Sequence, residues 1–458
     1  MAGIGFQLKN LIDNKNISSK LLAFGYSAML SSGSWLISII FIFIFSKIAI
    51  TIGGNKKSVY AFNVYITHVI ALSLIVSGLL QFEYTRFASD RIFEKKYNLI
   101  LPNFVGAMFI TAVLGFITGG VLGIYFFWSY NKFMIVLFAL NVSTTSSVFL
   151  SSSLLTGLKS FRYILFSFAF SYFLVGLFIL YFNENILMLV YGFYLSQSIL
   201  LITLSFRVFK DYHSDILIRF DFLKKPNKRI LILTGFLYNL AIWIDKYLFW
   251  FSETTSHKAI GNMGSSYFYD IPITLAYISL LPGISALFLY TEAEFFEYYD
   301  MYYSAVREFG TLKDLYYFAN LLVSSIRELV FSVMRIQIIF DIILIISQDN
   351  VFIKLLKIPK IYLLEIDIMI IAATVQLLLI TLFSICSYFD LMKDLLRISV
   401  VFLLTNFIFT YISIKMGPYY YGYGLLFSAT ISSLYAIYRL RRFLDEIHYY
   451  TFVHSGRL

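Results

Sequence analysis

The sequence has little of what an enzyme uses for chemistry. It holds one cysteine, Cys386, and five scattered histidines among 458 residues, and only 14% of its residues are charged. One cysteine cannot close an intrachain disulfide, and so few scattered ligands do not predict a metal cluster. Glycine-rich nucleotide loops and the GxSxG and HExxH motifs are also missing from the sequence. We therefore expect no enzyme, no catalytic residues, no metal and no cofactor.

Long apolar stretches fill the chain instead. Hydrophobic residues make up 59% of the sequence, and the first long stretch, Leu21–Phe45, carries no charge. About 20 helical residues cross the roughly 30 Å hydrocarbon core of a bilayer. Barrel strands would alternate polar and apolar residues, whereas these runs are continuously apolar. We expect an all-α, polytopic membrane protein whose helices lie at residues 21–46, 60–82, 103–128, 133–158, 161–182, 185–207, 229–252, 269–291, 327–347, 362–386, 396–415 and 419–440.

The basic residues predict the orientation of the chain. Lysine and arginine collect in the cytoplasmic loops of membrane proteins. With the N-terminus inside, the inside segments hold 25 of the 36 lysines and arginines, and the outside segments hold nine. The first twenty residues are polar and lack the apolar core of a cleavable signal, so we expect the first helix to be retained. Both termini are therefore predicted to be cytoplasmic, and the net charge of +10 is explained by topology and anionic lipid rather than by nucleic acid.

The most basic inside loop falls at the midpoint of the chain, with six predicted helices on each side. Six plus six is the arrangement of transporters built from two related halves. We expect a cytoplasmic segment at 1–20, a six-helix bundle at 21–207, a basic linker at 208–228, a second six-helix bundle at 229–443 and a cytoplasmic tail at 444–458.

Ionisable residues inside the predicted helices are candidates for a transport site. Such groups are expensive at membrane depth and face a partner or a water-filled passage. They form either ion pairs between helices or contacts with a substrate or gate, and both readings stay open. Adjacent helical residues point about 100° apart, so we do not expect Asp245 and Lys246 to share a neighbour. The candidates for the passage or its gate are Asp245, Lys246, Asp270, Arg335, Asp341, Trp35 and Trp243.

Two further features concern the shape of the passage. Pro282 and Gly283 interrupt the eighth predicted helix, which marks either a binding site or a kink. The first bundle is rich in serine, notably at Ser143–Ser147 and Ser151–Ser153, and its first two helices carry no acid. Serine either packs helices closely or lines a neutral passage, and a neutral passage suits sugars better than ions.

Residues 291–328 differ from the other inside segments. Acidic residues alternate there with aromatic ones at helical spacing, which predicts an amphipathic helix broken at Gly310, with Thr311 capping a second helix. Acids do not suit anionic headgroups. The segment is either a docking surface for a cytoplasmic partner or a helix lying against the protein's own cytoplasmic ends. The candidate docking residues are Glu294, Phe295, Tyr298, Tyr299 and Tyr302.

Short motifs spread over about two-thirds of the chain carry a family resemblance. They are Met1–Phe6, Gly25–Tyr26, Ser31–Trp35, Ile244–Trp250, Tyr269–Pro272, Leu281–Gly283, Thr291–Phe295, Tyr299–Asp300 and Ala305–Glu308. Together they resemble the PelG family, the membrane transporters of Pel exopolysaccharide systems. The resemblance implies the multidrug/oligosaccharidyl-lipid/polysaccharide (MOP) superfamily of flippases, with two six-helix bundles around a central cavity.

The same resemblance implies a function and partners. It implies export of a polymer rich in N-acetylgalactosamine across the bacterial cytoplasmic (inner) membrane, for the biofilm matrix. The partners implied are a cytosolic UDP-sugar glycosyltransferase of the PelF type and PelD-like and PelE-like membrane proteins, with a c-di-GMP signal arriving through PelD.

Three other functions remain open from the sequence. A flippase for lipid-linked oligosaccharides would need several cationic residues for a pyrophosphate, and the helices offer only Lys246 and Arg335. An ion-coupled drug antiporter would carry an acid in the first bundle, which the first two helices lack. A non-transporting scaffold for the glycosyltransferase fits the segment at 291–328 equally well.

Overall fold

The computed structural model describes residues 17–158, 160–224, 229–308 and 310–454, and the side chains of residues 17–23, 26, 29–36 and 454 are not among those described. Trp35 and most of the predicted N-terminal segment at 1–20 therefore lie outside the description. The described chain is helical nearly throughout, and all twelve predicted helices are present. Ten described helices have the length and composition to cross a membrane. The predicted all-α, polytopic fold is confirmed.

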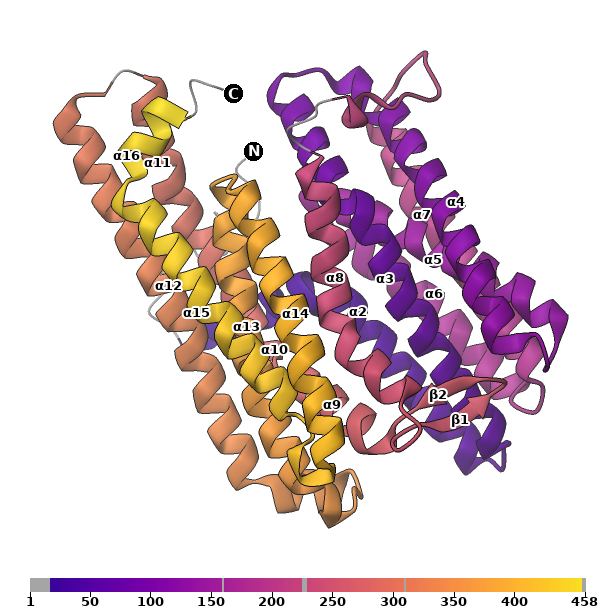
Figure 1. Cartoon of the computed structure of the whole chain (residues 1–458). Helices are drawn as coiled ribbons and strands as arrows, with labels where there is room; N and C mark the ends of the chain where they lie inside the picture. The colour runs from indigo at the N-terminus through magenta and orange to yellow at the C-terminus, as the bar shows by residue number, and fades with distance from the viewer. Residues whose placement is uncertain (1–16, 159, 225–228, 309, 455–458) are drawn as a thin grey trace. The chain divides into compact units, whose positions relative to one another are not determined.

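The first half of the chain supplies seven long helices (Figure 1). Asparagine begins three of them, because its side chain accepts backbone N–H groups that the first helical turn leaves unpaired. Asn55, Asn131 and Asn185 cap α3, α5 and α7 in this way. The seven are α2 (Ile17–Thr51), α3 (Lys56–Phe93), α4 (Ile100–Phe127), α5 (Lys132–Gly157), α6 (Phe161–Tyr181), α7 (Ile186–Asp211) and α8 (Ile230–Phe251).

A small β-hairpin follows α8. Strands β1 (His257–Ile260) and β2 (Met263–Ser265) pair antiparallel, with His257 opposite Ser265. Gly261 turns the chain between them with φ +54°, a conformation that glycine adopts without strain.

The helices of the second half of the chain are less regular than those of the first half. Thr291–Phe295 forms a π-helical turn between α10 and α11, and Thr311 caps α12 in a reciprocal capping box with Asp314. The helices are α9 (Tyr267–Ser279), α10 (Leu281–Tyr290), α11 (Phe296–Arg307), α12 (Leu312–Ile346), α13 (Leu363–Tyr388), α14 (Met392–Met416), α15 (Tyr423–Asp445) and the short α16 (Ile447–Tyr449).

The chain divides into two compact units. One contains Gly33–Tyr267, and the other contains Met1–Ser32 and Phe268–Leu458. Helix α8 belongs to the Gly33–Tyr267 unit and packs against α3. A Cβ atom on Gly235 would overlap the carbonyl oxygen of Gly78, so the two helix backbones touch at this pair of glycines.

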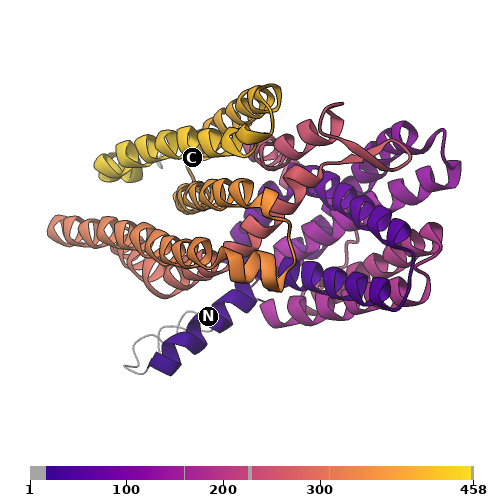
Figure 2. The same cartoon turned by 90° about the horizontal axis from the view of Figure 1, so that it is seen from below.

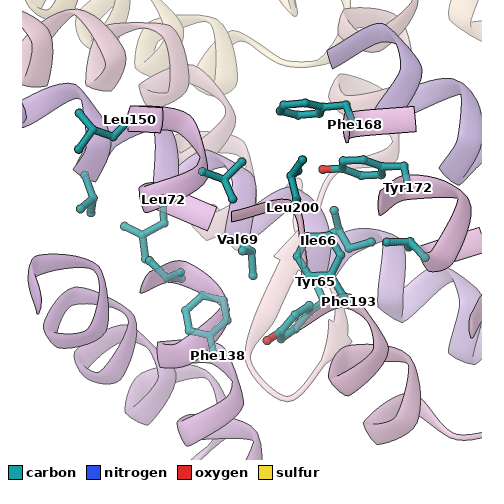
Figure 3. Packing of buried hydrophobic residues seen from close by; sticks show 14 of the residues in the cluster. Tyr65, Ile66, Val69, Leu72, Phe138, Leu150, Phe168, Tyr172, Phe193 and Leu200 are labelled. Carbon is teal, nitrogen blue, oxygen red and sulfur yellow. The ribbon is translucent and has the colours of Figure 1, made fainter. Parts of the chain in front are cut away.

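The core of the Gly33–Tyr267 unit is built around α3 (Figure 3). The rings of Phe168 and Tyr172 stack at a centroid distance of 6.2 Å, and the Tyr65 hydroxyl accepts a hydrogen bond of 3.1 Å from Asn141 Nδ2. Side chains from α3, α5, α6 and α7 meet in this core, including Tyr65, Ile66, Val69, Leu72, Phe138, Leu150, Phe168, Tyr172, Phe193 and Leu200.

Small residues bring α4 and α5 together. Cβ atoms on Gly115 and Gly119 would lie 2.9 Å from the Cα atoms of Ser143 and Ala139, so only glycine fits there. The α5 serines Ser146, Ser147 and Ser151 are buried, and their hydroxyls bond to carbonyls of their own helix. These three side chains therefore serve helix packing, the first of the two readings that the sequence left open.

Helix α12 is longer than a bilayer needs. Its 35 residues extend over about 52 Å, against a hydrocarbon core of about 30 Å. Both views show α11 lying alongside the first part of α12 (Figures 1 and 2). We name α11, the first turns of α12 and residues Ile447–Tyr450 the projection.

Candidate transport site

The buried ionic centre of the Gly33–Tyr267 unit lies on α8. Lys246 Nζ lies 2.9 Å from Asp245 Oδ2, and the two side chains are 4% and 0% exposed. Lys246 Nζ also donates to the carbonyl oxygen of Ile242, one turn earlier, at 2.8 Å. The flexible lysine side chain thus folds back along its own helix. Asp245 and Lys246 thus pair with each other, a contact that the expectation of different neighbours did not include.

Aromatic rings surround this ion pair. Lys246 Nζ lies 5.7 Å from the centroid of the Trp243 ring, a cation–π distance. The Trp243 ring in turn lies 6.2 Å from Trp250, and Trp250 lies 4.3 Å from the ring of His68 on α3. The predicted candidates Asp245, Lys246 and Trp243 therefore form one cluster, which continues through Trp250 to α3.

His68 connects this cluster to the β-hairpin. The buried His68 ring places Nε2 2.8 Å from the carbonyl oxygen of Gly264. The hairpin is also held by Asn262, whose backbone N–H donates to the carbonyl oxygen of Phe126 at 2.9 Å. Tyr60 and Ser265 hydroxyls lie 2.5 Å apart. The hairpin is thereby fixed against α3 and α4, at the end of α8 that the predicted topology places outside.

In the other unit, the predicted eighth helix is broken into α9 and α10, and a side chain lies in the break. Helix α9 ends at Ser279 and α10 begins at Leu281. In an unbroken helix the N–H of Gly283 would donate to the carbonyl oxygen of Ser279. Here Gln337 Nε2 donates to Ser279 O at 3.0 Å, and Gly283 N–H donates to Gln337 Oε1 at 3.0 Å. The amide of Gln337 thus stands between two groups that would otherwise bond each other.

Glycine and a buried acid complete this arrangement. We call the Gln337 side chain in this position the wedge. A Cβ atom on Gly283 would approach Gln337 Oε1 to 2.6 Å, so the wedge requires glycine at this position. Gln337 Nε2 donates its second hydrogen bond to Asp341 Oδ1 at 2.7 Å, and the Thr374 hydroxyl donates to Asp341 Oδ2. Asp341 is buried. The predicted candidate Asp341 therefore fixes the break of α9–α10 to α12 and α13.

The remaining ionisable candidates are placed differently. Arg335 lies on the same helix as Asp341, but its side chain is 63% exposed and its Nη2 lies 3.6 Å from Glu328 Oε1. Asp270 is half-buried in the first turn of α9. Whether any of these residues contacts the transported substrate stays a prediction.

The aromatic stripe of α11 and the preceding π-helical turn is covered by the chain itself. Phe295 is buried, with its ring 5.2 Å from Tyr388, and the Tyr299 hydroxyl donates to the carbonyl oxygen of Tyr388 at 3.1 Å. Tyr302 is buried against the C-terminal residues, with its hydroxyl 3.2 Å from Thr451 Oγ1. Phe295 and Tyr302 thus pack against other residues of the chain itself, as in the second of the two readings that the sequence left open. Glu294 and Tyr298, the other candidates, are half-buried.

A histidine sits where the C-terminal residues meet this stripe. His448 Nδ1 lies 3.4 Å from the Tyr302 hydroxyl, and its ring lies 4.5 Å from the ring of Tyr316 on α12. Burial lowers the pKa of His448 below its ordinary value of 6.5. The neutral imidazole is thus the form that fits this joint.

Sequence reasoning missed His68, Gln337 and the hairpin. Gln337 is neutral and His68 is a single histidine in an apolar helix, so neither side chain stands out in the sequence as a charged residue at membrane depth does. The contact of Gln337 with Gly283 joins residues 54 positions apart. The signal available for the break was the Pro282–Gly283 pair, which locates the interruption and not the residue that fills it.

Solved structures match the fold over nearly the whole chain. An outward-facing multidrug resistance MATE family transporter of the MOP superfamily matches with a TM-score of 0.63 at 11% identity, covering 96% of this chain and 98% of that one. An inward-facing MATE family transporter of the same superfamily matches with a TM-score of 0.61 at 12% identity, over 97% and 98% of the two chains. A MATE in complex with MaD3S gives 0.65 at 12% identity, over 96% and 99%. The chain therefore has the fold of these MOP-superfamily structures, and ten helices in its described part are long and apolar enough to cross a membrane.

The family is shown by the sequence as a whole. A family model named PelG and described as "Putative exopolysaccharide Exporter (EPS-E)" matches residues 1–452. The chain belongs to the PelG family of exopolysaccharide exporters, as the short motifs predicted. No curated protein matches the chain.

Proposed function

We propose that the protein exports a neutral Pel-type polysaccharide, rich in N-acetylgalactosamine, across the bacterial cytoplasmic membrane for the biofilm matrix. The observation that carries this proposal is the PelG family match over residues 1–452, together with the MOP transporter fold. Both termini are placed in the cytoplasm, on the basis of 25 lysines and arginines inside against nine outside.

The surroundings of the buried charges favour a neutral cargo. Lys246 is held by Asp245 at 2.9 Å, and Arg335 lies beside Glu328 at 3.6 Å. A lipid-linked oligosaccharide carries a pyrophosphate, which is bound most strongly by arginine or lysine free to form charge-assisted bonds. Because both cations predicted at membrane depth already face a carboxylate, a flippase for lipid-linked oligosaccharides is the less favoured alternative.

The proposed exporter works with a synthase. Polymer would be supplied by a cytosolic UDP-sugar glycosyltransferase of the PelF type, with PelD-like and PelE-like proteins in the same membrane. This partnership rests on the family. In the proposed topology the projection reaches into the cytoplasm, on the side where the glycosyltransferase works. The competing reading, a scaffold that anchors the glycosyltransferase without transporting, predicts the same partners.

Genetic complementation tests the proposal. The chain is supplied to a cell that carries the other genes of a Pel-type system but lacks its own exporter. Secreted polymer is measured with a lectin for N-acetylgalactosamine, and glycosyltransferase activity is measured in the membrane fraction. Restored secretion with unchanged membrane-bound glycosyltransferase is expected. The scaffold would be favoured by two results together. Glycosyltransferase activity would leave the membrane fraction when the chain is absent, and polymer secretion would survive substitutions on α8 and α12.

A further inference from the structure

The chain between α7 and α8 exposes a run of large apolar side chains. Ile216, Leu217, Ile218 and Phe220 are 41–67% exposed, with Leu217 the most exposed. Contiguous apolar groups of this kind mark an interaction surface when they occur outside a folded core. We name residues 216–220 the apolar tip.

The apolar tip is clamped to the first turns of α4. The N–H of Arg219 donates to the carbonyl oxygen of Pro102 at 2.9 Å, and the N–H of Asp221 donates to Asn103 Oδ1 at 2.7 Å. A Cβ atom on Gly106 would overlap the carbonyl oxygen of Arg219, so this close approach needs glycine. The segment is thus held in a defined position against α4.

A buried ring fixes the end of the same segment. Phe222 is 1% exposed, and its ring lies 5.9 Å from Tyr84 and 6.4 Å from Phe87 on α3. The apolar tip is exposed although the residues that follow it are anchored. The exposed side chains of the apolar tip therefore belong to a segment that is held in place.

The clamp holds the apolar tip beside the start of α4, a helix long and apolar enough to cross a membrane. Its contacts run from Pro102 to Gly106, a length of about 6 Å along α4. Segments that lie in a membrane interface bury their apolar face about 5–10 Å into the boundary between headgroups and acyl chains. Phe109 on α4 and Phe206 on α7 are also exposed.

Basic residues accompany the apolar tip. Residues 207–229 contain seven lysines and arginines against three aspartates. Lys210 and Lys224 are exposed, and Lys95 and Lys96 are exposed in the turn before α4. Anionic lipids attract basic groups placed next to the membrane.

From the clamp, the exposed apolar side chains and the excess of basic residues, we propose that residues 216–220 insert into the membrane leaflet at the N-terminal end of α4 and favour anionic phospholipid there. In the proposed topology this is the cytoplasmic leaflet. The anchor would hold this end of the Gly33–Tyr267 unit to the lipid surface. A cytosolic protein covering the same side chains is the competing occupant.

Fluorescent labelling of the full chain distinguishes these occupants. A single cysteine is introduced as Leu217→Cys and carries an environment-sensitive dye, because the one native thiol, Cys386, is fully buried. Val121→Cys, on the exposed apolar surface of α4, is the lipid control, and Lys313→Cys, exposed in the first turn of α12, is the water control. The unsubstituted chain reports any labelling of Cys386.

The labelled proteins are placed in nanodiscs of phosphatidylcholine alone or with phosphatidylglycerol, each with a spin-labelled lipid as quencher. We expect the dye at position 217 to be blue-shifted and quenched as at position 121, and more so with phosphatidylglycerol. Lys210→Gln with Lys224→Gln should remove the difference between the two lipids. Emission like that at position 313 in both lipids would overturn insertion and favour a protein occupant. Equal insertion in both lipids would overturn the anionic preference.

Discussion

Replacing Gln337 by leucine should straighten the break between α9 and α10 while leaving the bundle folded. The substitution removes the hydrogen bonds of the Gln337 amide to Ser279 O, Gly283 N–H and Asp341 Oδ1. Ser279 and Gly283 are four residues apart, so their backbone groups can then bond each other as in a continuous helix. Pro282 still prevents one helical bond, so some of the kink remains.

The expected loss of stability follows from the bonds removed. Buried hydrogen bonds contribute about 0.6–1.5 kcal/mol each, so three of them sum to about 2–4 kcal/mol. Closing the backbone bond between Ser279 and Gly283 returns about 1 kcal/mol. The net destabilisation is therefore about 1–3 kcal/mol. Gln376→Leu is the matched control, because it removes the bond accepted from the Tyr277 hydroxyl and should cost about 1 kcal/mol or less.

Two measurements check this prediction. Thermal unfolding in detergent compares the stabilities of the two variants with that of the unsubstituted protein. Electron–electron double resonance measures the distance between spin labels at Thr274 and Phe296, two exposed positions about 33 Å apart along a straight helix. The distance should lengthen in Gln337→Leu and stay constant in Gln376→Leu. An unchanged distance, or equal destabilisation by both variants, would refute the role of Gln337 as a wedge.

Three further predictions concern other parts of the chain. Asp245→Asn removes the carboxylate that lies 2.9 Å from the buried Lys246 Nζ and should lower stability by about 3–5 kcal/mol. The exchanged pair Asp245→Lys with Lys246→Asp should recover purified yield, and if yield recovers without export, one of the two groups has a role in transport. Gly235→Ala should destabilise by about 1–3 kcal/mol, measured by thermal unfolding, because its Cβ would overlap the backbone of Gly78. Gly120→Ala, which meets open space, is the control, and equal effects of the two would contradict close packing. The contact of His448 with Tyr302 and Tyr316 should loosen as the pH falls. Burial lowers the pKa of this histidine, so protonation favours the state in which the C-terminal residues have left this contact. Its stability is present above about pH 6.5 and is lost below it. Hydrogen exchange at Ile447–Tyr450 should speed up below pH 6.5 relative to the intrinsic rate, and a similar change in His448→Phe would exclude titration of the histidine.

The spans could be predicted from the sequence because the bilayer imposes a length and a composition on each of them. Helix ends were harder to predict where a helix leaves the membrane. The helix capped by Thr311 begins at Leu312 as predicted, but it continues without a break into the span expected from residue 327, because the polar and aromatic residues of its first turns are helical without being apolar. Hydropathy predicts which residues lie inside the membrane. It does not predict how far a helix continues outside the membrane.

The packing partners could not be predicted, because they come from distant parts of the chain. The α11 stripe is amphipathic, as predicted, but amphipathicity does not say what covers the apolar face. Here it is covered by Tyr388 and by the C-terminal residues, so Tyr302 meets Thr451 across 149 positions. Similarly, the angle of about 100° between neighbouring helical residues does not reveal that the Lys246 side chain folds back to meet Asp245.

Export by this chain can be measured most directly in inverted membrane vesicles that contain the glycosyltransferase and its membrane partners. Radiolabelled UDP-N-acetylgalactosamine is added outside, where the cytoplasmic face is exposed. If the chain is the conduit, labelled polymer should accumulate in the vesicle lumen, protected from an added glycosidase, only when the chain is present. Polymer that forms in equal amount but stays outside and open to the glycosidase would contradict transport by this protein.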